Sequence, residues 1–115
     1  MKDTSYFGLK NAFRGIKTFL KVHKSHWIVL FLIILVLFLA LPLGLNPIEE
    51  ILLVLNLGLI WVFEMINTAL ELTVDMITEE YNEKAKKVKD IASGAVLTTK
   101  IIFIINLILL LTNHV

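Results

Sequence analysis

The stretch "WIVLFLIILVLFLALPLGL", residues 27–45, contains no charged residue. A helix needs roughly 20 apolar residues to cross the hydrocarbon core of a bilayer. Two further apolar runs, residues 51–77 and 91–111, are also long enough, and the chain of 115 residues is 57% hydrophobic. The sequence therefore predicts an all-α membrane protein with three transmembrane helices. Because the first run starts late and two more follow it, a signal peptide is not expected.

The basic residues gather in two places, which predicts the orientation of the spans. All but one of the eleven lie before the first run or between the second and the third: Lys2, Lys10, Arg14, Lys17, Lys21, Lys24, Lys84, Lys86, Lys87 and Lys89. Cytoplasmic loops carry the excess of Lys and Arg. We therefore expect the N-terminus and the 78–90 loop to be cytoplasmic, and the 42–50 turn and the C-terminus to lie outside.

Residues 5–24 have the pattern of a helix that lies on the membrane surface. Basic side chains recur at steps of three and four, and Leu9, Phe13, Ile16 and Leu20 form an apolar stripe beside them. This amphipathic pattern is typical of an interfacial helix. A simple lipid anchor and a part in catalysis both remain open for it. The length predicts a single domain over residues 1–115, and without cysteine no disulfide or Cys-based metal site is expected.

The stretch "FEMINTALELTVD", residues 63–75, places polar residues inside an apolar run. At 100° per residue, Glu64, Asn67, Glu71 and Asp75 share one face about 80° wide. A charge at mid-bilayer costs at least ~2.5–3.5 kcal/mol, so such residues usually face protein or water and mark a working site. The alternative is a helix-packing seam of paired polar groups.

Carboxylates on such a face suit one kind of chemistry. They are ligands for a hard cation such as Mg²⁺, and a further carboxylate can act as general base. Basic residues nearby bind phosphate, so the set predicts a phosphoryl-transfer site. Asp90, Ser93 and Gly94 form a second polar face at the same membrane depth. Close helix packing at this small-residue segment and a ligand role for Ser93 both remain open.

The stretches "FEMINTALELTVD" and "EYNEKAKKVKDIASGAVL" resemble the prokaryotic diacylglycerol kinase family, the small integral-membrane lipid kinases. Order and spacing match without a gap across residues 63–97. The resemblance implies a homotrimer in the bacterial cytoplasmic membrane, with active sites shared between subunits. It also implies transfer of the ATP γ-phosphate to a membrane lipid hydroxyl, with Mg²⁺ as cofactor. The expected product is phosphatidic acid from diacylglycerol, and the alternative acceptor is undecaprenol.

The resemblance also assigns roles to residues. Glu64 is implied as the catalytic base, with Asn67 and Asp75 orienting the site. Glu71 is implied as a metal ligand and Ser93 as a lipid-binding residue. The residues implied in ATP binding are Glu80, Tyr81, Asn82, Lys89 and Asp90.

Two positions depart from the family pattern. The family has a second metal-binding Glu eight residues after the Gly of the surface helix, where this chain has His23. An imidazole binds metals but carries no negative charge and suits Mg²⁺ poorly. The family is apolar at the position of Lys100. The lysine side chain can extend to the cytoplasmic face or pair with Glu71, and we predict the ion pair with Glu71.

Two other functions are considered. One is a catalytically weak or inactive membrane scaffold of the same fold, which the change at His23 favours. The other is a small ion or proton channel lined by the acidic face, which the clustered basic residues make a poorer fit. We expect no nucleic-acid partner.

Overall fold

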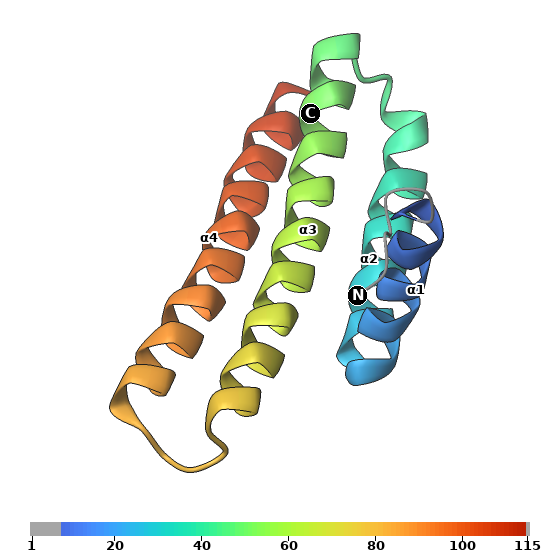
Figure 1. The fold of residues 1–115 in the computed structure, drawn as a ribbon. Coiled ribbons are helices and arrows are strands. Elements are labelled where there is room, and N and C mark those ends of the chain that lie inside the picture. The colour runs from blue at the N-terminus through green and yellow to red at the C-terminus, as the bar shows by residue number, and fades with distance from the viewer. Residues whose placement is uncertain (1–7, 115) are drawn as a thin grey trace.

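The computed structural model describes residues 8–114, and these residues form helices and connecting turns without any strand (Figure 1). The elements are α1 (Gly8–Val22), α2 (Ser25–Ala40), the short 3-10 helix η1 (Leu41–Leu43), α3 (Pro47–Ile77) and α4 (Glu83–Asn113). Three segments are long and apolar enough to cross a membrane: Ser25–Leu43, Pro47–Ile77 and Glu83–Asn113. The predicted all-α architecture with three candidate spans and an N-terminal helix is confirmed.

Helices α3 and α4 lie side by side and antiparallel over most of their length (Figure 1). Each has 31 residues, which corresponds to about 46 Å at 1.5 Å per residue. A hydrocarbon core is about 30 Å thick, so the helix ends extend beyond the apolar layer. The buried apolar side chains of this pair are Leu53, Leu57, Ile60, Val74, Ala92, Val96 and Leu110.

Local sequence sets where the two long helices begin and end. Asn46 and Glu49 form a capping box at the start of α3, with Pro47 at the first helical position, where a missing N–H costs nothing. Helix α3 ends at Ile77, and the side chain of Asn82 accepts hydrogen bonds from the backbone N–H groups of Lys84 and Ala85. The connection is therefore a five-residue turn, residues 78–82.

Helix α1 packs beside α2, and the joint between these two helices contacts α3 through His26 and Thr68. His26 is buried, and its ring stacks on Phe19 with centroids 3.8 Å apart. Its Nδ1 lies 2.6 Å from the Phe19 carbonyl oxygen and its Nε2 lies 3.2 Å from Thr68 Oγ1. Because a carbonyl only accepts, Nδ1 carries the proton, and Nε2 is free to accept from the threonine hydroxyl. Of the surface helix predicted over residues 5–24, residues 5–7 lie outside the described part.

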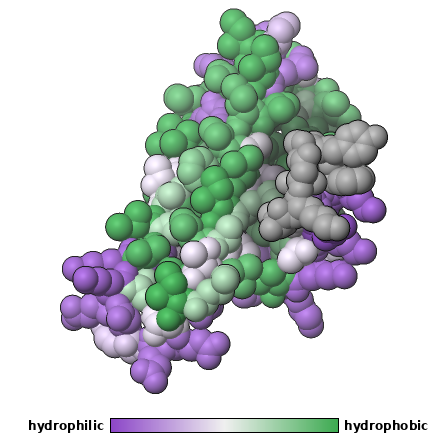
Figure 2. All heavy atoms as spheres, viewed as in Figure 1, coloured by the Kyte–Doolittle hydropathy of each residue, from purple (hydrophilic) through white to green (hydrophobic). Residues whose placement is uncertain are grey.

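The surface divides into an apolar middle and polar ends. In Figure 2, hydrophobic residues cover most of the visible length of the helices, and hydrophilic residues gather at the α3–α4 turn and along the α1 side. Large apolar side chains such as Phe31, Phe38 and Ile104 are more than half exposed. A soluble monomer rarely leaves apolar patches of this extent open to water, so this belt indicates contact with lipid.

Candidate active site

The polar face of α3 contacts two different neighbours. Glu64 is buried, and its Oε1 lies 2.8 Å from Lys100 Nζ on α4. Two turns further along, Glu71 Oε2 lies 3.8 Å from His23 Nε2 in the joint between α1 and α2. The prediction that Lys100 pairs with Glu71 is therefore wrong. Asn67 is half-buried on the same face, between the two carboxylates in sequence.

The register of the hairpin explains which residues meet. Asp75 Oδ1 accepts a hydrogen bond from Lys89 Nζ at 2.8 Å, close to the turn. Glu64 and Asp75 are eleven residues apart on α3, and Lys89 and Lys100 are eleven residues apart on α4. Eleven residues make about three helical turns, so two antiparallel helices that pair at Asp75 and Lys89 pair again at Glu64 and Lys100.

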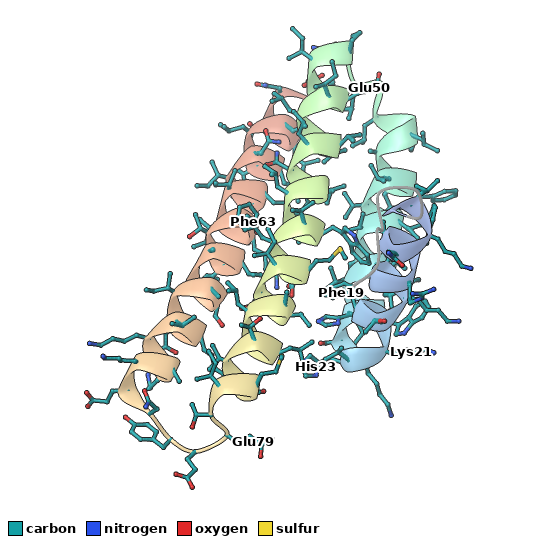
Figure 3. The ribbon with its side chains drawn as sticks, viewed as in Figure 1. Phe19, Lys21, His23, Glu50, Phe63 and Glu79 are labelled. Atoms are coloured by element: carbon teal, nitrogen blue, oxygen red, sulfur yellow. The ribbon has the colours of Figure 1, made fainter. Side chains whose placement is uncertain are left out.

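A hollow of about 340 Å³ lies at the α3–α4 turn. Its lining includes Asp75 and all five residues predicted to bind ATP: Glu80, Tyr81, Asn82, Lys89 and Asp90. Lys86 also lines it and donates a 2.6 Å hydrogen bond to Asp90. The structure thus brings the polar ends of both motifs together around one cavity that opens at the end of the hairpin. Glu79 marks this turn in Figure 3.

The two residues predicted to bind metal are neighbours. His23 lies on the side of the α1–α2 joint that faces α3 (Figure 3). Among residues 8–114, no group of three or more metal-binding side chains is found. Mg²⁺ commonly takes one or two carboxylates and completes its shell with water and substrate phosphates. Glu71 fits that mode, whereas the imidazole of His23 adds no negative charge.

Ser93, like Glu64, Asn67, Glu71 and His23, does not line the hollow. It is exposed on α4, and the hairpin register places it level with Glu71 on the neighbouring helix. Close helix approach is not seen at the adjacent Gly94, since a Cβ built there meets no other heavy atom within 4 Å among the described residues. Ala92 is the small residue of this segment that is buried.

The sequence profile of prokaryotic diacylglycerol kinases matches residues 10–111 of this chain. The chain belongs to the prokaryotic diacylglycerol kinase family. It is similar to the diacylglycerol kinase of Escherichia coli (strain K12), with 34% identity over 82 residues, which cover 71% of this chain and 67% of that protein. The diacylglycerol kinase of Shigella flexneri shows the same figures.

A second kind of relative is the undecaprenol kinase of Bacillus subtilis (strain 168). It is 44% identical over 52 residues, which cover 45% of this chain and 42% of that protein. The family is thus one of lipid kinases, and membership supports a multi-pass membrane kinase that uses ATP and a divalent metal. The names of these relatives specify two different lipids, diacylglycerol and undecaprenol.

Two contacts near the site were not predicted from the sequence. One is the ion pair of Glu64 with Lys100, and a signal for it exists in the equal eleven-residue spacing on the two helices. The other is the hydrogen bond between His26 and Thr68, which no pattern in the sequence predicts. It joins residues 42 positions apart, and only the packing of α2 on α3 brings them together.

Proposed function

We propose that this protein is an ATP- and Mg²⁺-dependent lipid kinase of the bacterial cytoplasmic membrane, with residues 1–115 acting as one catalytic domain. It transfers the γ-phosphate of ATP to diacylglycerol and forms phosphatidic acid. One observation carries the proposal: the hollow at the α3–α4 turn collects the polar ends of both family motifs, and Asp75 in its wall lies one helical turn from Glu71.

The hollow is lined by four carboxylates and two lysines, a set that suits a nucleotide together with its metal ion. Lys86 and Lys89 line it and supply cations for phosphate oxygens. Glu71 lies between the hollow and Glu64 along α3, so it is placed to hold the metal ion that comes with the phosphates. When bound, that ion neutralises phosphate charge. Tyr81 is well exposed beside the hollow and offers a ring against which a nucleotide base can stack.

Glu64 performs the proton transfer in this proposal. Its carboxylate accepts the proton of the lipid hydroxyl as the hydroxyl oxygen bonds to the γ-phosphorus. The bond from that phosphorus to the bridging oxygen breaks, and ADP leaves with the electron pair. Glu64 lies about 16 Å from Asp75 along the helix, which places the base among apolar side chains, where a lipid hydroxyl arrives from the membrane.

The exposed polar groups and the basic segments support the assembly and the orientation that we propose. Asn67, Glu71 and Ser93 stay at least partly exposed on the single chain. Polar groups at membrane depth are costly unless protein or water covers them, and this supports a homotrimer in which neighbouring copies complete each site. The basic α1 and the charged turn face the cytoplasm, and the C-terminus lies outside.

Undecaprenol is the second candidate acceptor. The observation in its favour is the 44% identity over 52 residues with an undecaprenol kinase. Both lipids present a primary hydroxyl at the membrane interface, so the same proton transfer serves either one.

Phosphate transfer from ATP labelled at the γ-position tests the proposal. The purified protein is assayed in mixed micelles with Mg²⁺, with diacylglycerol and with undecaprenol in separate reactions. Glu64→Gln is expected to lower the rate at least about 100-fold, since general-base catalysis contributes 10²–10⁴. Glu50→Gln is the matched control: it removes the same charge from the opposite end of α3 and is expected to keep the wild-type rate.

The outcomes separate the alternatives. Transfer to one lipid that Glu64→Gln abolishes and Glu50→Gln preserves identifies both the activity and the acceptor. A folded wild-type protein that phosphorylates neither lipid contradicts the kinase proposal and favours a scaffold of the same fold. Ion flux through liposomes without ATP would instead indicate the channel.

A further inference from the structure

Lys100 lies in the middle of the apolar run 91–111, where the neighbouring residues are Thr98, Thr99, Ile101 and Ile102. A lysine at this depth is expensive, and such residues are found paired or facing a functional site. The structure pairs it with Glu64, at 2.8 Å. This is the carboxylate to which the proposed function gives the proton transfer, so the pair joins the most unusual cation of the chain to the proposed base.

Burial of its carboxylate sets this ion pair apart from the two pairs near the α3–α4 turn. The Glu64 side chain is 11% exposed, whereas those of Asp75 and Asp90 are 50% and 62% exposed. An exposed ion pair contributes little, because water solvates both partners. A buried carboxylate without a partner is costly in its charged form and tends to take up a proton. Glu64 therefore depends on its partner, and the two exposed aspartates do not.

Within residues 8–114, the other basic side chains near this face have partners of their own. Lys89 is bonded to Asp75, Lys86 to Asp90, and His23 lies against Glu71. His26 uses both ring nitrogens, on Phe19 and Thr68. Lys100 is thus the side chain that balances the charge of Glu64 in this structure.

We propose that Lys100 is a positioning residue for the kinase reaction: it holds the buried Glu64 carboxylate against α4, oriented to accept the proton of the lipid hydroxyl. This inference rests on the proposed lipid-kinase function. The hydroxyl proton goes to Glu64, the oxygen bonds to the γ-phosphorus, ADP leaves with the electrons of the broken bond, and water later takes the proton from Glu64.

The experiment compares kinetic constants of Lys100→Met, Lys100→Arg and wild type in mixed micelles, with the lipid that wild type phosphorylates. Methionine keeps the length of the side chain and removes the charge, and arginine keeps the charge. We expect Lys100→Met to lower kcat about tenfold or more, a part of what general-base catalysis contributes. The KM for ATP should stay within about twofold, and Lys100→Arg should recover most of kcat.

His114→Gln is the matched control, since it breaks another cross-helix contact of the same hairpin, with Glu49 at the far end. A residue that only holds α3 and α4 together would behave like His114, with lower stability and unchanged kcat. Equal kcat for wild type and Lys100→Met overturns the proposal. A higher kcat for Lys100→Met also overturns it, because the pair would then restrain Glu64 instead of preparing it.

A stability measurement covers the case in which Lys100→Met does not fold well. Adding Glu64→Gln removes the stranded charge, so the double variant should unfold at a higher temperature than Lys100→Met alone. No such recovery would show that Lys100 acts independently of Glu64, which contradicts the inference. Failure of the proposed function gives a different result: wild type itself transfers no phosphate, while this stability difference remains measurable.

Discussion

The two ends of the α3–α4 hairpin carry similar residues and use them differently. At the end that we propose to face outward, called the outer end and defined by Asn46, Glu49 and His114, the Glu49 carboxylate accepts a hydrogen bond from the Asn46 backbone N–H. Each of its oxygens also lies 2.9 Å from His114 Nε2. At the inner end, defined by the turn 78–82 with Asp75 and Lys89, the charged side chains are half exposed and surround a hollow.

This difference shows that residue type alone does not separate a structural contact from a site. Both ends place a carboxylate opposite a basic side chain across the same two helices. At the outer end the polar atoms bond to one another and to a helix terminus, so a ligand would have to break those bonds. At the inner end Lys89 is bonded to Asp75 and Lys86 to Asp90, but these pairs are well exposed and line a hollow, so phosphates can reach the lysines from open space.

Removing one carboxylate from each half of α3 gives the largest expected difference between the two ends of the hairpin. Glu71→Gln should lower kcat/KM for Mg·ATP at least about tenfold, because loss of a group that holds or orients a metal typically costs 10–100-fold. Glu49→Gln should leave it unchanged. The measurement is the rate of lipid phosphorylation over a series of Mg²⁺ concentrations, with the half-saturating concentration expected to rise for Glu71→Gln.

A uniform loss of activity in both variants would contradict this division of the hairpin, as would an unchanged Mg²⁺ requirement for Glu71→Gln. Circular dichroism and size in detergent serve as the control, since both variants remove one charge from the same helix and should keep its helix content.

Much of the fold was predictable from the sequence, because the apolar runs give the helices directly. The start of α3 is encoded locally in Asn46, Pro47 and Glu49, whose capping box needs no tertiary information. The end of α3 was harder to place. Residues 78–90 are polar and mostly good helix formers, and the break after Ile77 depends on Thr78 and on Asn82 capping the next helix.

The sequence predicts which face of α3 carries the candidate site, but it does not predict which side chains of other helices contact that face. Helical periodicity places Glu64, Asn67 and Glu71 on one side of α3, but it does not say which helix covers which part of that side. The partner of Lys100 depends on the register between α3 and α4, and the register depends on the length of a turn that propensity alone does not fix. The roles of these residues stay predictions until they are measured.

The buried contact of His26 with Thr68 on α3 lies between the two ends of the hairpin, and we expect it to affect stability more than activity. His26→Phe keeps an aromatic ring against Phe19 but removes the bonds to the Phe19 carbonyl and to Thr68. Leaving buried polar groups unsatisfied costs about 1–3 kcal/mol, so the free energy of unfolding in detergent should fall by about that amount. The kcat of lipid phosphorylation should stay within about threefold of the wild-type value.

Thr68→Val on its own provides the check on His26→Phe, because it removes the hydroxyl at the other end of the same bond. A loss of activity in both variants without a loss of stability would mean that this contact belongs to the site and not to the scaffold.

The smallest expected effect is at the outer end. Asn46→Ala removes the side chain that accepts the Glu49 backbone N–H in the capping box, and the loss of such a cap costs about 1 kcal/mol. Thermal unfolding in detergent should show this decrease, with lipid phosphorylation at the wild-type rate.

Asn82→Ala removes the corresponding cap of α4, where the side chain accepts hydrogen bonds from two backbone N–H groups. It also changes the wall of the hollow. If the two ends differ as described, the two variants lose similar stability, and only Asn82→Ala raises the KM for ATP. Equal effects on KM would show that Asn82 serves the helix and not the nucleotide.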